Sequence, residues 1–418
     1  MECLRSGRTA CAAIIAAASI AAAAPGGVPV ELSVNGRSSA NVSMAAGGRF
    51  VAAVWGASLE SGVTDLYAAV SRDAGATFGA AIRVNDRDGQ ANLSGEQPPR
   101  IALVRQSAGD PAISVVWTAK TADGTVLLET TSRNGGKSFA PATIVAGSRG
   151  AGNRGWESVA VDARGRVAVV WLDHREHVPA HPEAAAAPAQ HEHPGGVPMA
   201  ELSKLYFGRL DGSLDGRPVT GGVCYCCKTA LAAGADGALY AAWRHVFPGD
   251  IRDIAFTVSR DSGRTFAPIA RVSDDRWMLQ GCPEDGPAIV VDSKNRAHVV
   301  WPTLVSRSGL PDAKALFYAS SADGQHFDAR QRLPTEGTPQ HPQLAIAPDG
   351  SLAVVWDESS SGARRVVLAR FRPGDSSPPR FIRSVLSGSE RAVYPAIAAT
   401  RDGVVTAWTT GTVIRVKR

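Results

Sequence analysis

The chain has 418 residues and a formal net charge of +5, with 44% hydrophobic residues, 43 Gly and 26 Pro. This length supports a large core, and many glycines and prolines beside short apolar runs favour strands and turns over a helical bundle. The charge excess is small and no Lys/Arg cluster stands out, so we expect no nucleic-acid partner.

Residues 1–24 have the pattern of a secretory signal peptide. Arg5 and Arg8 come before an apolar, Ala- and Ile-rich run over residues 10–24. The run is too short and too rich in alanine for a membrane anchor, and no later segment is apolar enough to span a bilayer. We therefore expect a periplasmic or secreted protein, without stable membrane insertion, whose mature part is one domain over residues 25–418.

The rest of the chain repeats one phrase, a short apolar strand that ends in tryptophan. The spacing ranges from 52 residues (Trp356 to Trp408) to 72 residues (Trp171 to Trp243). Each repeat offers four strand patterns bounded by Gly, Asp and Ser, which is typical of a propeller blade. The seven tryptophans are Trp55, Trp117, Trp171, Trp243, Trp301, Trp356 and Trp408.

The last repeat, which begins at Tyr394, offers only three strands before the chain ends. Residues 28–36 resemble the fourth strands of other repeats, so the N-terminal strand is expected to complete the last blade and close the ring. The fold class that we predict is all-β, a monomeric β-propeller of four-stranded antiparallel blades. Seven blades are favoured, and six are the alternative.

A second motif follows the third strand of several repeats. Residues 71–78 and 259–266 fit the pattern Ser-x-Asp-x-Gly-x-Thr-Phe, and residues 132–139 fit it with Asn in place of Asp. Residues 320–327 match more weakly, with Ala322 at the Asp position. The motif resembles the Asp box of the sialidase-like (BNR repeat) propeller superfamily, over nearly the whole mature chain. The resemblance implies that these boxes are structural and lie on the face opposite the active site.

The same resemblance implies a possible catalytic set. Family sialidases hold the substrate carboxylate with three arginines and use a Tyr–Glu nucleophile pair and an Asp acid/base. The nearest matches here are Arg100, which precedes Ile101 in the second repeat, and Tyr394 with Glu390 just before it. The family's early arginine motif has no counterpart in the first repeat. An exo-α-sialidase-type glycoside hydrolase is therefore an alternative function, with Arg100, Tyr394 and Glu390 as candidate catalytic residues.

Cysteine and histidine residues converge on the loop face opposite the boxes when the repeats are aligned on their tryptophans. Four cysteines of two adjacent repeats precede the innermost strand, and a His-rich insertion over residues 173–196 opens on the same face. Thiolate and imidazole together suit copper or zinc, although the spacing does not match a zinc finger, because paired Cys-x2-Cys motifs are missing. The candidate metal ligands are Cys224, Cys226, Cys227, Cys282, His174, His177 and His245.

Two structural alternatives remain open for these residues. A Cys224–Cys282 disulfide could join two blades in an oxidising compartment, and the histidine loop could be a disordered insertion. Further residues at equivalent inner-strand positions are expected to line a ligand pocket at the same mouth: Trp156, Glu157, Glu284, Asp285 and His341.

The sequence thus predicts an exported sialidase-like propeller that binds a ligand, with a Cys/His-bound copper or zinc ion, on its axial face. The expected partner is a glycan or small ligand, or a periplasmic protein. A protein–protein interaction scaffold is a further alternative, because loops vary freely on a rigid propeller frame.

Overall fold

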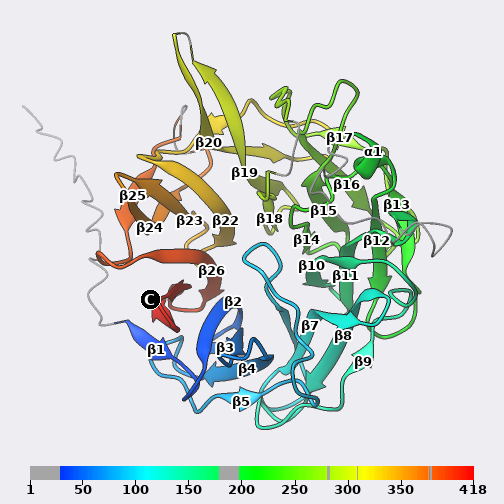
Figure 1. The fold of residues 1–418 in the computed structure, drawn as a ribbon. Helices are drawn as coiled ribbons and strands as arrows, with labels where there is room; N and C mark the ends of the chain where they lie inside the picture. Colours follow the sequence, from blue (N-terminus) through cyan, green and yellow to red (C-terminus); the bar gives the residue numbers. More distant parts are fainter. Residues whose placement is uncertain (1–28, 178–196, 280–282, 308, 375, 377–378) are drawn as a thin grey trace, which may run out of the picture.

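The structure is a computed structural model that describes residues 29–177, 197–279, 283–307, 309–374, 376 and 379–418. Seven four-stranded antiparallel sheets surround a central axis as the blades of a ring (Figure 1). The expected propeller is confirmed, with seven blades rather than six. The predicted signal peptide and most of the His-rich insertion lie outside the described residues.

Each of the first six blades is built in chain order, from the innermost strand outward. Blade 1 contains β2 (Ser38–Gly47), β3 (Phe50–Ser58), β4 (Thr64–Ser71) and β5 (Ile82–Arg83). Blade 2 contains β6 (Arg100–Val104), β7 (Ala112–Thr121), β8 (Gly124–Ser132) and β9 (Thr143–Ile144). Blade 3 contains β10 (Arg154–Val161), β11 (Val167–Asp173), β12 (Lys204–Arg209) and β13 (Arg217–Thr220). Blade 4 contains β14 (Ala230–Ala233), β15 (Leu239–Arg244), β16 (Ile254–Ser259) and β17 (Ala270–Arg271). Blade 5 contains β18 (Ala288–Val291), β19 (Ala297–Arg307), β20 (Leu310–Ser321) and β21 (Gln331–Arg332). Blade 6 contains β22 (Thr338–Ile346), β23 (Leu352–Ser360), β24 (Ala363–Phe371) and β25 (Ile382–Val385).

The seventh blade joins the two ends of the described chain. Its strands are β26 (Ala392–Thr400), β27 (Gly403–Thr410), β28 (Val413–Lys417) and, outermost, β1 (Val30–Leu32). In this pairing Val30 lies opposite Val416, and Leu32 lies opposite Ile414. The expected closure by the N-terminal strand is therefore confirmed.

Helix is almost absent from this architecture. The η1 turn (Arg175–His177) and the α1 helix (Val197–Glu201) stand on either side of the His-rich insertion. Within the described residues, no helix has the length and apolar character that crossing a membrane requires.

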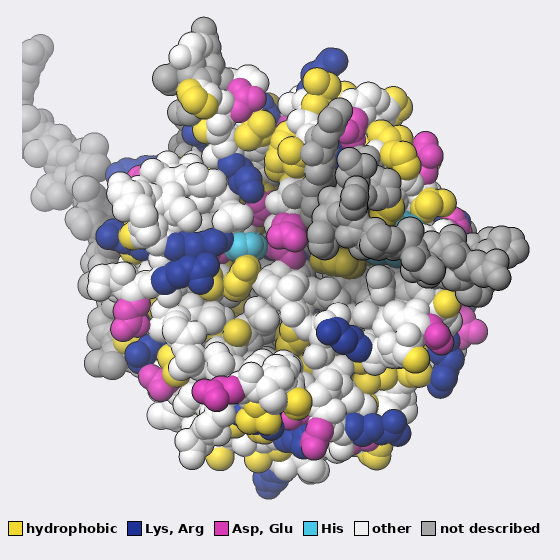
Figure 2. All heavy atoms as spheres, in the orientation of Figure 1, with side chains coloured by type: hydrophobic (Ala, Val, Ile, Leu, Met, Phe, Trp, Pro, Cys, Tyr) yellow, Lys and Arg dark blue, Asp and Glu magenta, His cyan; other side chains and the backbone are white. Residues whose placement is uncertain are grey.

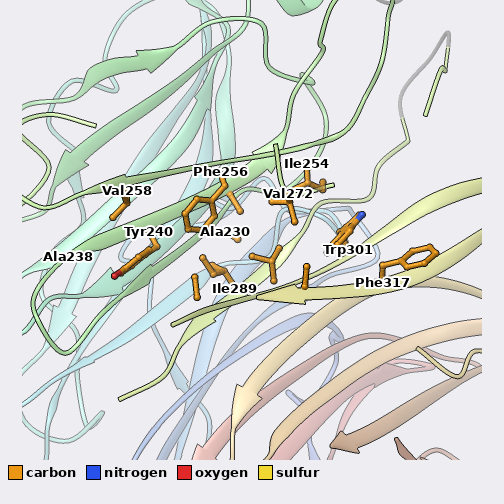
Figure 3. Close-up of a cluster of buried hydrophobic side chains, with 14 of the residues drawn as sticks. Ala230, Ala238, Tyr240, Ile254, Phe256, Val258, Val272, Ile289, Trp301 and Phe317 are labelled. Atoms are coloured by element: carbon orange, nitrogen blue, oxygen red, sulfur yellow. The ribbon is translucent and has the colours of Figure 1, made fainter. Parts of the chain in front are cut away.

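The repeated tryptophans form the core of the ring. Each belongs to the second strand of its blade and is at most 2% exposed. Figure 3 shows one such cluster between blades 4 and 5, where Tyr240 and Phe256 face Ile289, Trp301 and Phe317. Burying one large apolar side chain stabilises a fold by roughly 1.5–3 kcal/mol. The repeated phrase in the sequence is therefore the pattern that packs blade against blade.

The Asp-box turns contain the hydrogen bonds that their residue types predict. In the first box, Gly75 N donates to Ser71 Oγ (2.8 Å), and Thr77 N and Thr77 Oγ1 donate to the two oxygens of Asp73 (2.9 and 2.6 Å). The box at Ser259 repeats this pattern.

The box of blade 5 corrects the alignment made from sequence. Ala322 does not stand at the acidic position, because Asp323 accepts hydrogen bonds from Gln325 N and His326 N (both 2.8 Å). Gly324 N donates to Ser321 Oγ (2.9 Å). This box is one residue shorter between its acidic residue and its glycine, so it fits from Ser321 rather than from Ser320.

Four inner strands share an irregularity that places side chains near the axis. The pairing of β2, β10, β22 and β26 with their neighbours slips by one residue, as in a β-bulge. At each slip one non-glycine residue has a positive φ: Asn41 (59°), Trp156 (53°), His341 (52°) and Tyr394 (53°). A β-bulge changes the direction in which a side chain points, and these four bulges lie in the first half of the inner strands.

Candidate functional site

The mouth of the axis is covered by the chain's own connection between blades 1 and 2. Residues 84–99, called here the mouth loop, run from β5 to β6 and reach into the centre of the ring (Figure 1). A Cβ on Gly95 would lie 1.8 Å from Cε1 of Tyr394, so only glycine fits there. Gln97 Nε2 donates to Thr118 Oγ1 (2.5 Å) in blade 2. The mouth loop therefore packs directly on a candidate catalytic side chain.

Glu96, in the mouth loop, reaches across the axis to blades 4 and 5. Its Oε2 accepts hydrogen bonds from Lys228 N (3.3 Å) and Gly286 N (3.0 Å), and Lys228 Nζ lies 3.8 Å from its Oε1. Both side chains are buried, and burial lowers the pKa of Lys228 while Glu96 opposes that change. The contacts form a carboxylate-binding cradle that the chain's own glutamate fills.

Arg100 and Glu157 form a second polar group beside the axis. Arg100 Nε donates to the carbonyl of Glu157 (2.6 Å), and the Glu157 side chain is fully buried, with Oε2 accepting from Thr118 Oγ1 (3.1 Å). Burial raises the pKa of Glu157 to about 7, although Arg100 opposes the shift. A cavity of about 140 Å³ adjoins Arg100 and Ser158. Arg100 is thus a half-buried axial residue, and Glu157 can hold or release a proton near neutrality.

A hydrogen-bonded network surrounds His341 on the other side of the mouth. His341 Nδ1 lies 2.7 Å from Oδ1 of Asp357, and His341 N donates to Asp285 Oδ1 (3.3 Å). The ring of His341 packs on that of Tyr394, with centroids 4.4 Å apart. Figure 2 shows basic, acidic and histidine side chains next to one another beside the axis.

Two basic side chains complete this network. Lys314 pairs with Asp285, and Arg364 pairs with Asp357. Burial raises the pKa of Asp285, and Lys314 opposes the shift. Two residues that the sequence predicted for the site, Glu284 and Glu390, are not part of this buried network, because their side chains are exposed. Burial raises the pKa of the Tyr394 hydroxyl. The Arg364 guanidinium opposes this rise, and the Asp357 carboxylate adds to it.

The cysteines form a compact cluster in the connection between β13 and β14. The Sγ atoms of Cys224, Cys226 and Cys227 lie within 4.8 Å of one another, and all three residues are buried. Cys224 Sγ is 3.6 Å from Cys227 Sγ and 4.0 Å from Cys226 Sγ. Trp156, a sequence-predicted pocket residue, packs against the cluster. Blades 3 and 4 therefore meet at the cluster.

Two buried guanidinium groups make this cluster electropositive. Arg252 Nη1 donates to Cys224 Sγ (3.4 Å), and Arg244 donates to the backbone carbonyls of Asp285, Arg252 and Pro302. The pKa of Cys224 is lowered to about 7, mainly by a hydrogen bond from Cys227 and further by Arg252 and Arg244. Burial raises the pKa of Cys227. Cys224 is therefore the thiol that ionises first.

The oxidation state of the cluster changes two sequence-based interpretations. Cys224 and Cys227 carry free thiols, whereas Cys226 is disulfide-bonded. The Cys224–Cys282 disulfide considered above is thus not present, and Cys282 itself lies outside the described residues. Cys224 and Cys227 also form a Cys-x2-Cys pair, so the expectation that such pairs are missing is wrong.

The predicted histidine ligands lie close by but are not part of this sulfur group. The ring of His174 stacks on that of His177, with centroids 4.9 Å apart, and is tilted by 46° against that of Trp156, at 5.4 Å. His177 Nε2 contacts Met199 O (3.0 Å), and His245 Nδ1 accepts from Trp243 Nε1 (3.4 Å). Among the described residues, no histidine nitrogen belongs to the group of three sulfur atoms that lie within 4.8 Å of one another.

Burial keeps two of these histidines neutral. It lowers the pKa of His174 to about 3 and that of His245 to about 4. Nε2 of His174 is buried and has no hydrogen-bond partner among the described residues. A neutral imidazole is the form that binds metals.

Sequence reasoning missed Glu96, Lys228, Lys314, Asp357 and Arg364. Lys228 follows the cysteine motif directly, and Asp357 follows Trp356, so their positions in the repeats gave a signal. Glu96 gave none, because its partners are more than a hundred residues away in sequence.

The closed ring of seven four-stranded blades defines the fold as a seven-bladed β-propeller. No family model and no curated protein matches the chain. Among solved structures it is similar to an ulvan lyase described as a new family of polysaccharide lyase, with a TM-score of 0.57 and 8% identity over 93% of this chain and 95% of that one.

Two further structures are similar over most of their length. The α-L-arabinofuranosidase from Fusarium graminearum has a TM-score of 0.51 and 14% identity, covering 83% of this chain and 98% of that one. A protein of unknown function from Dyadobacter fermentans has a TM-score of 0.51 and 14% identity, covering 93% and 97%. At these identities the similarities establish the fold alone.

Proposed function

We propose that this protein is an exported propeller that binds a copper ion through the cysteine cluster on its axial face. The observation that carries the proposal is the pair of buried free thiols of Cys224 and Cys227, whose Sγ atoms lie 3.6 Å apart. Thiolates select soft or borderline ions, of which copper(I) and zinc are the common ones.

The electrostatics of the cluster favour a metal–thiolate group over neutral thiols. Two thiolates and one copper(I) ion carry a net negative charge, and Arg252 and Arg244 supply buried positive charge beside them. The guanidinium of Arg244 donates to uncharged backbone carbonyls. A buried cation is costly unless an anion compensates it, so a thiolate group stabilises this region.

The number of available sulfurs favours copper(I) over zinc. With Cys226 disulfide-bonded, the chain offers the thiols of Cys224 and Cys227. Two thiolates are sufficient for copper(I), whereas structural zinc sites have four ligands. His174, whose neutral imidazole packs next to Trp156, is a candidate for an additional ligand after a side-chain movement.

The test uses the full chain, purified without chelator from the periplasmic or culture fraction. We expect about one equivalent of copper per chain, and tight copper(I) binding in competition with a chromogenic chelator. The double variant Cys224→Ser/Cys227→Ser should lose this binding, and Cys226→Ser, which keeps the pair, should retain it. Equal copper(I) affinity of the double variant and the unchanged chain would overturn the proposal, and recovery of the chain only from the cytoplasm would overturn export.

The second candidate function is binding or hydrolysis of an acidic glycan at the mouth. The observation in its favour is the carboxylate of Glu96 in a cradle of Lys228 and Gly286, because a ligand carboxylate has the same chemistry. Glu157, with a pKa of about 7, supplies a proton-transfer group near Arg100. Two proteins of similar fold are named as a lyase and a glycosidase.

A fluorogenic sialoside and a fluorogenic uronide test this second candidate. Release of product that Arg100→Ala or Tyr394→Phe abolishes would support hydrolysis. Retention of a periplasmic protein, with neither metal nor turnover, would instead favour the interaction scaffold.

A further inference from the structure

A small cavity lies on the axis of the ring, among the innermost strands. Its volume is about 140 Å³, and all of its lining residues belong to β2, β6, β10, β22 and β26, the innermost strands of five blades. Each of these strands pairs with a neighbour on one side only, so its other edge presents unpaired backbone N–H and C=O groups to the axis. Ser43, Ser158 and Gln343 each stand two positions after a bulge residue, so the cavity lies farther from the mouth than the bulges do.

Arg100 brings a positive charge to this cavity, and most of its N–H donors have no acceptor. A guanidinium carries several N–H donors and is not deprotonated in proteins. Among the described residues, only its Nε–H has an acceptor, the carbonyl of Glu157 (2.6 Å), and the buried Nη2 has none. A charge that is removed from water is costly unless a partner compensates it. Because Arg100 adjoins the cavity, that partner can bind there.

The two carboxyl groups that act on Arg100 electrostatically, Glu157 and Glu96, form no ion pair with it. The carboxylate of Glu96 accepts hydrogen bonds from two backbone N–H groups across the axis. The carboxyl of Glu157 accepts from Thr118 Oγ1, and its pKa of about 7 means that it keeps its proton in more acidic solution. Below about pH 7, Arg100 is therefore a cation without an ion-pair partner among the described residues.

Neutral donors from three other blades complete the polar lining. The side chains of Ser43 and Gln343 have no hydrogen bond within the described ranges, and Ser158 Oγ accepts one from Leu231 N (3.1 Å), which leaves its own O–H to donate. No carboxylate is among the described residues that line the cavity, and the other lining side chains are apolar. This lining suits an anion rather than a cation.

The volume of the cavity limits what can bind. One buried water needs roughly 10–15 Å³, so the cavity has room for a small anion together with water. Pockets for larger organic ligands measure roughly 300 Å³ or more. A sugar is therefore too large for this cavity.

We propose that the axial cavity is a binding site for one small monovalent anion, of the size of chloride, held by Arg100 with Gln343 and Ser43. The anion would compensate the charge of Arg100 and connect the innermost strands of blades 1, 2 and 6 through one ion. The proposal rests neither on copper binding at the cysteine cluster nor on glycan binding at the mouth.

The first experiment locates the ion in the unchanged chain. Crystals of the full chain, grown below about pH 7 with sodium bromide as the halide, are measured at the bromine absorption edge. We expect an anomalous peak inside the cavity, at hydrogen-bond distance from Nη1 or Nη2 of Arg100. Crystals that show water in the cavity and no bromide peak would overturn the proposal without any variant.

The second experiment measures how the anion affects folding. Urea unfolding of the full chain is followed below about pH 7 in mixtures of sodium bromide and sodium gluconate at constant ionic strength, because gluconate is too large for the cavity. If one ion leaves on unfolding, the unfolding equilibrium constant should fall about tenfold for each tenfold rise in bromide once the site is mostly filled.

Arg100→Met, which removes the charge and keeps a side chain of similar length, should lose this dependence on bromide, and Gln343→Leu should weaken it. The matched control is Arg105→Met, at an exposed arginine just after β6, which should keep the full dependence. Equal dependence on bromide in Arg100→Met, Gln343→Leu and the unchanged chain would overturn the proposal. Copper binding and turnover are measured separately, so each proposal can fail alone.

Discussion

At the scale of single residues, the axis of this propeller is rich in buried charge. Glu96, Glu157 and Asp285 are buried carboxyl groups, and Lys228 and Arg244 are buried cations. Glu96 lies beside Lys228, while the carbonyls of Glu157 and Asp285 accept hydrogen bonds from arginines. Such groups are costly for stability and cluster at functional sites. The residues around the mouth are therefore the first to test.

Glu157→Gln is expected to change how stability depends on pH. The folded-state pKa of about 7 lies above the ordinary value of 4.5, so this stabilisation is full below about pH 4.5 and is lost as the pH rises to 7. A shift of this size corresponds to about 3 kcal/mol. The variant has no such proton, so its free energy of unfolding in urea should decline less between about pH 5 and pH 8.

The exposed change Glu60→Gln is the matched control and should keep the slope of the unchanged chain. Burial also raises the pKa of Glu129 to about 7. Glu129 therefore contributes the same pH dependence of stability to the unchanged chain and to both variants. Parallel curves for Glu157→Gln and the unchanged chain would show that Glu157 does not retain its proton in the fold.

At the scale of elements, the mouth loop decides what can reach the axis. It ends a blade, crosses the mouth and begins the next blade, and its Gly95 and Glu96 contact blade 7 and blades 4 and 5. Residues at the bulges of the inner strands include Trp156, which packs against the cysteine cluster, and His341 and Tyr394, which pack against each other. Blades with nearly the same strands thus differ in the connections that surround the axis.

Gly95→Ala is expected to displace the mouth loop, because the added Cβ would meet the ring of Tyr394 at 1.8 Å. Overpacking of this kind costs about 1–3 kcal/mol. Urea unfolding should show the loss, and hydrogen exchange should become faster over residues 84–99. The control is Gly388→Ala between β25 and β26, where a Cβ meets nothing within 4 Å. Equal stability and exchange in both variants would contradict the close packing of the loop.

At the scale of the whole molecule, stability depends on closing the ring. The strand that closes it, β1, has only three residues, and its Leu32 is 5% exposed against β28. Without β1 the longer edge of β28 would be open to pairing with another chain. Segments from the two ends of the described chain therefore hold one blade together.

Leu32→Asp is expected to lower the free energy of unfolding by about 3 kcal/mol, because it removes an apolar side chain from the core and buries a charge. It should also promote self-association, which light scattering after size exclusion would detect. The matched control is Ile382→Asp on the outer strand β25, where Ile382 is 58% exposed. A monomeric Leu32→Asp as stable as this control would contradict closure by β1.

The sequence alone determined the ring. Its seven tryptophan phrases, four-strand repeats and incomplete last repeat predicted the blades and their closure, because hydrophobic periodicity and turn residues are local signals. The same alignment brought Cys224, Cys226 and Cys227 to the axial face. The sequence also pointed to Arg100 and Tyr394, but only through a family resemblance.

Only the tertiary structure decided how the site is organised. The guanidinium of Arg252 on Cys224 and the carboxylate of Glu96 across the mouth both depend on segments that are separated in the chain. Glycine at position 95 reads as a turn residue until the ring of Tyr394 is seen against it. Local patterns fix strands, whereas partners across an axis, and the pKa values that they shift, follow from packing that no local pattern records.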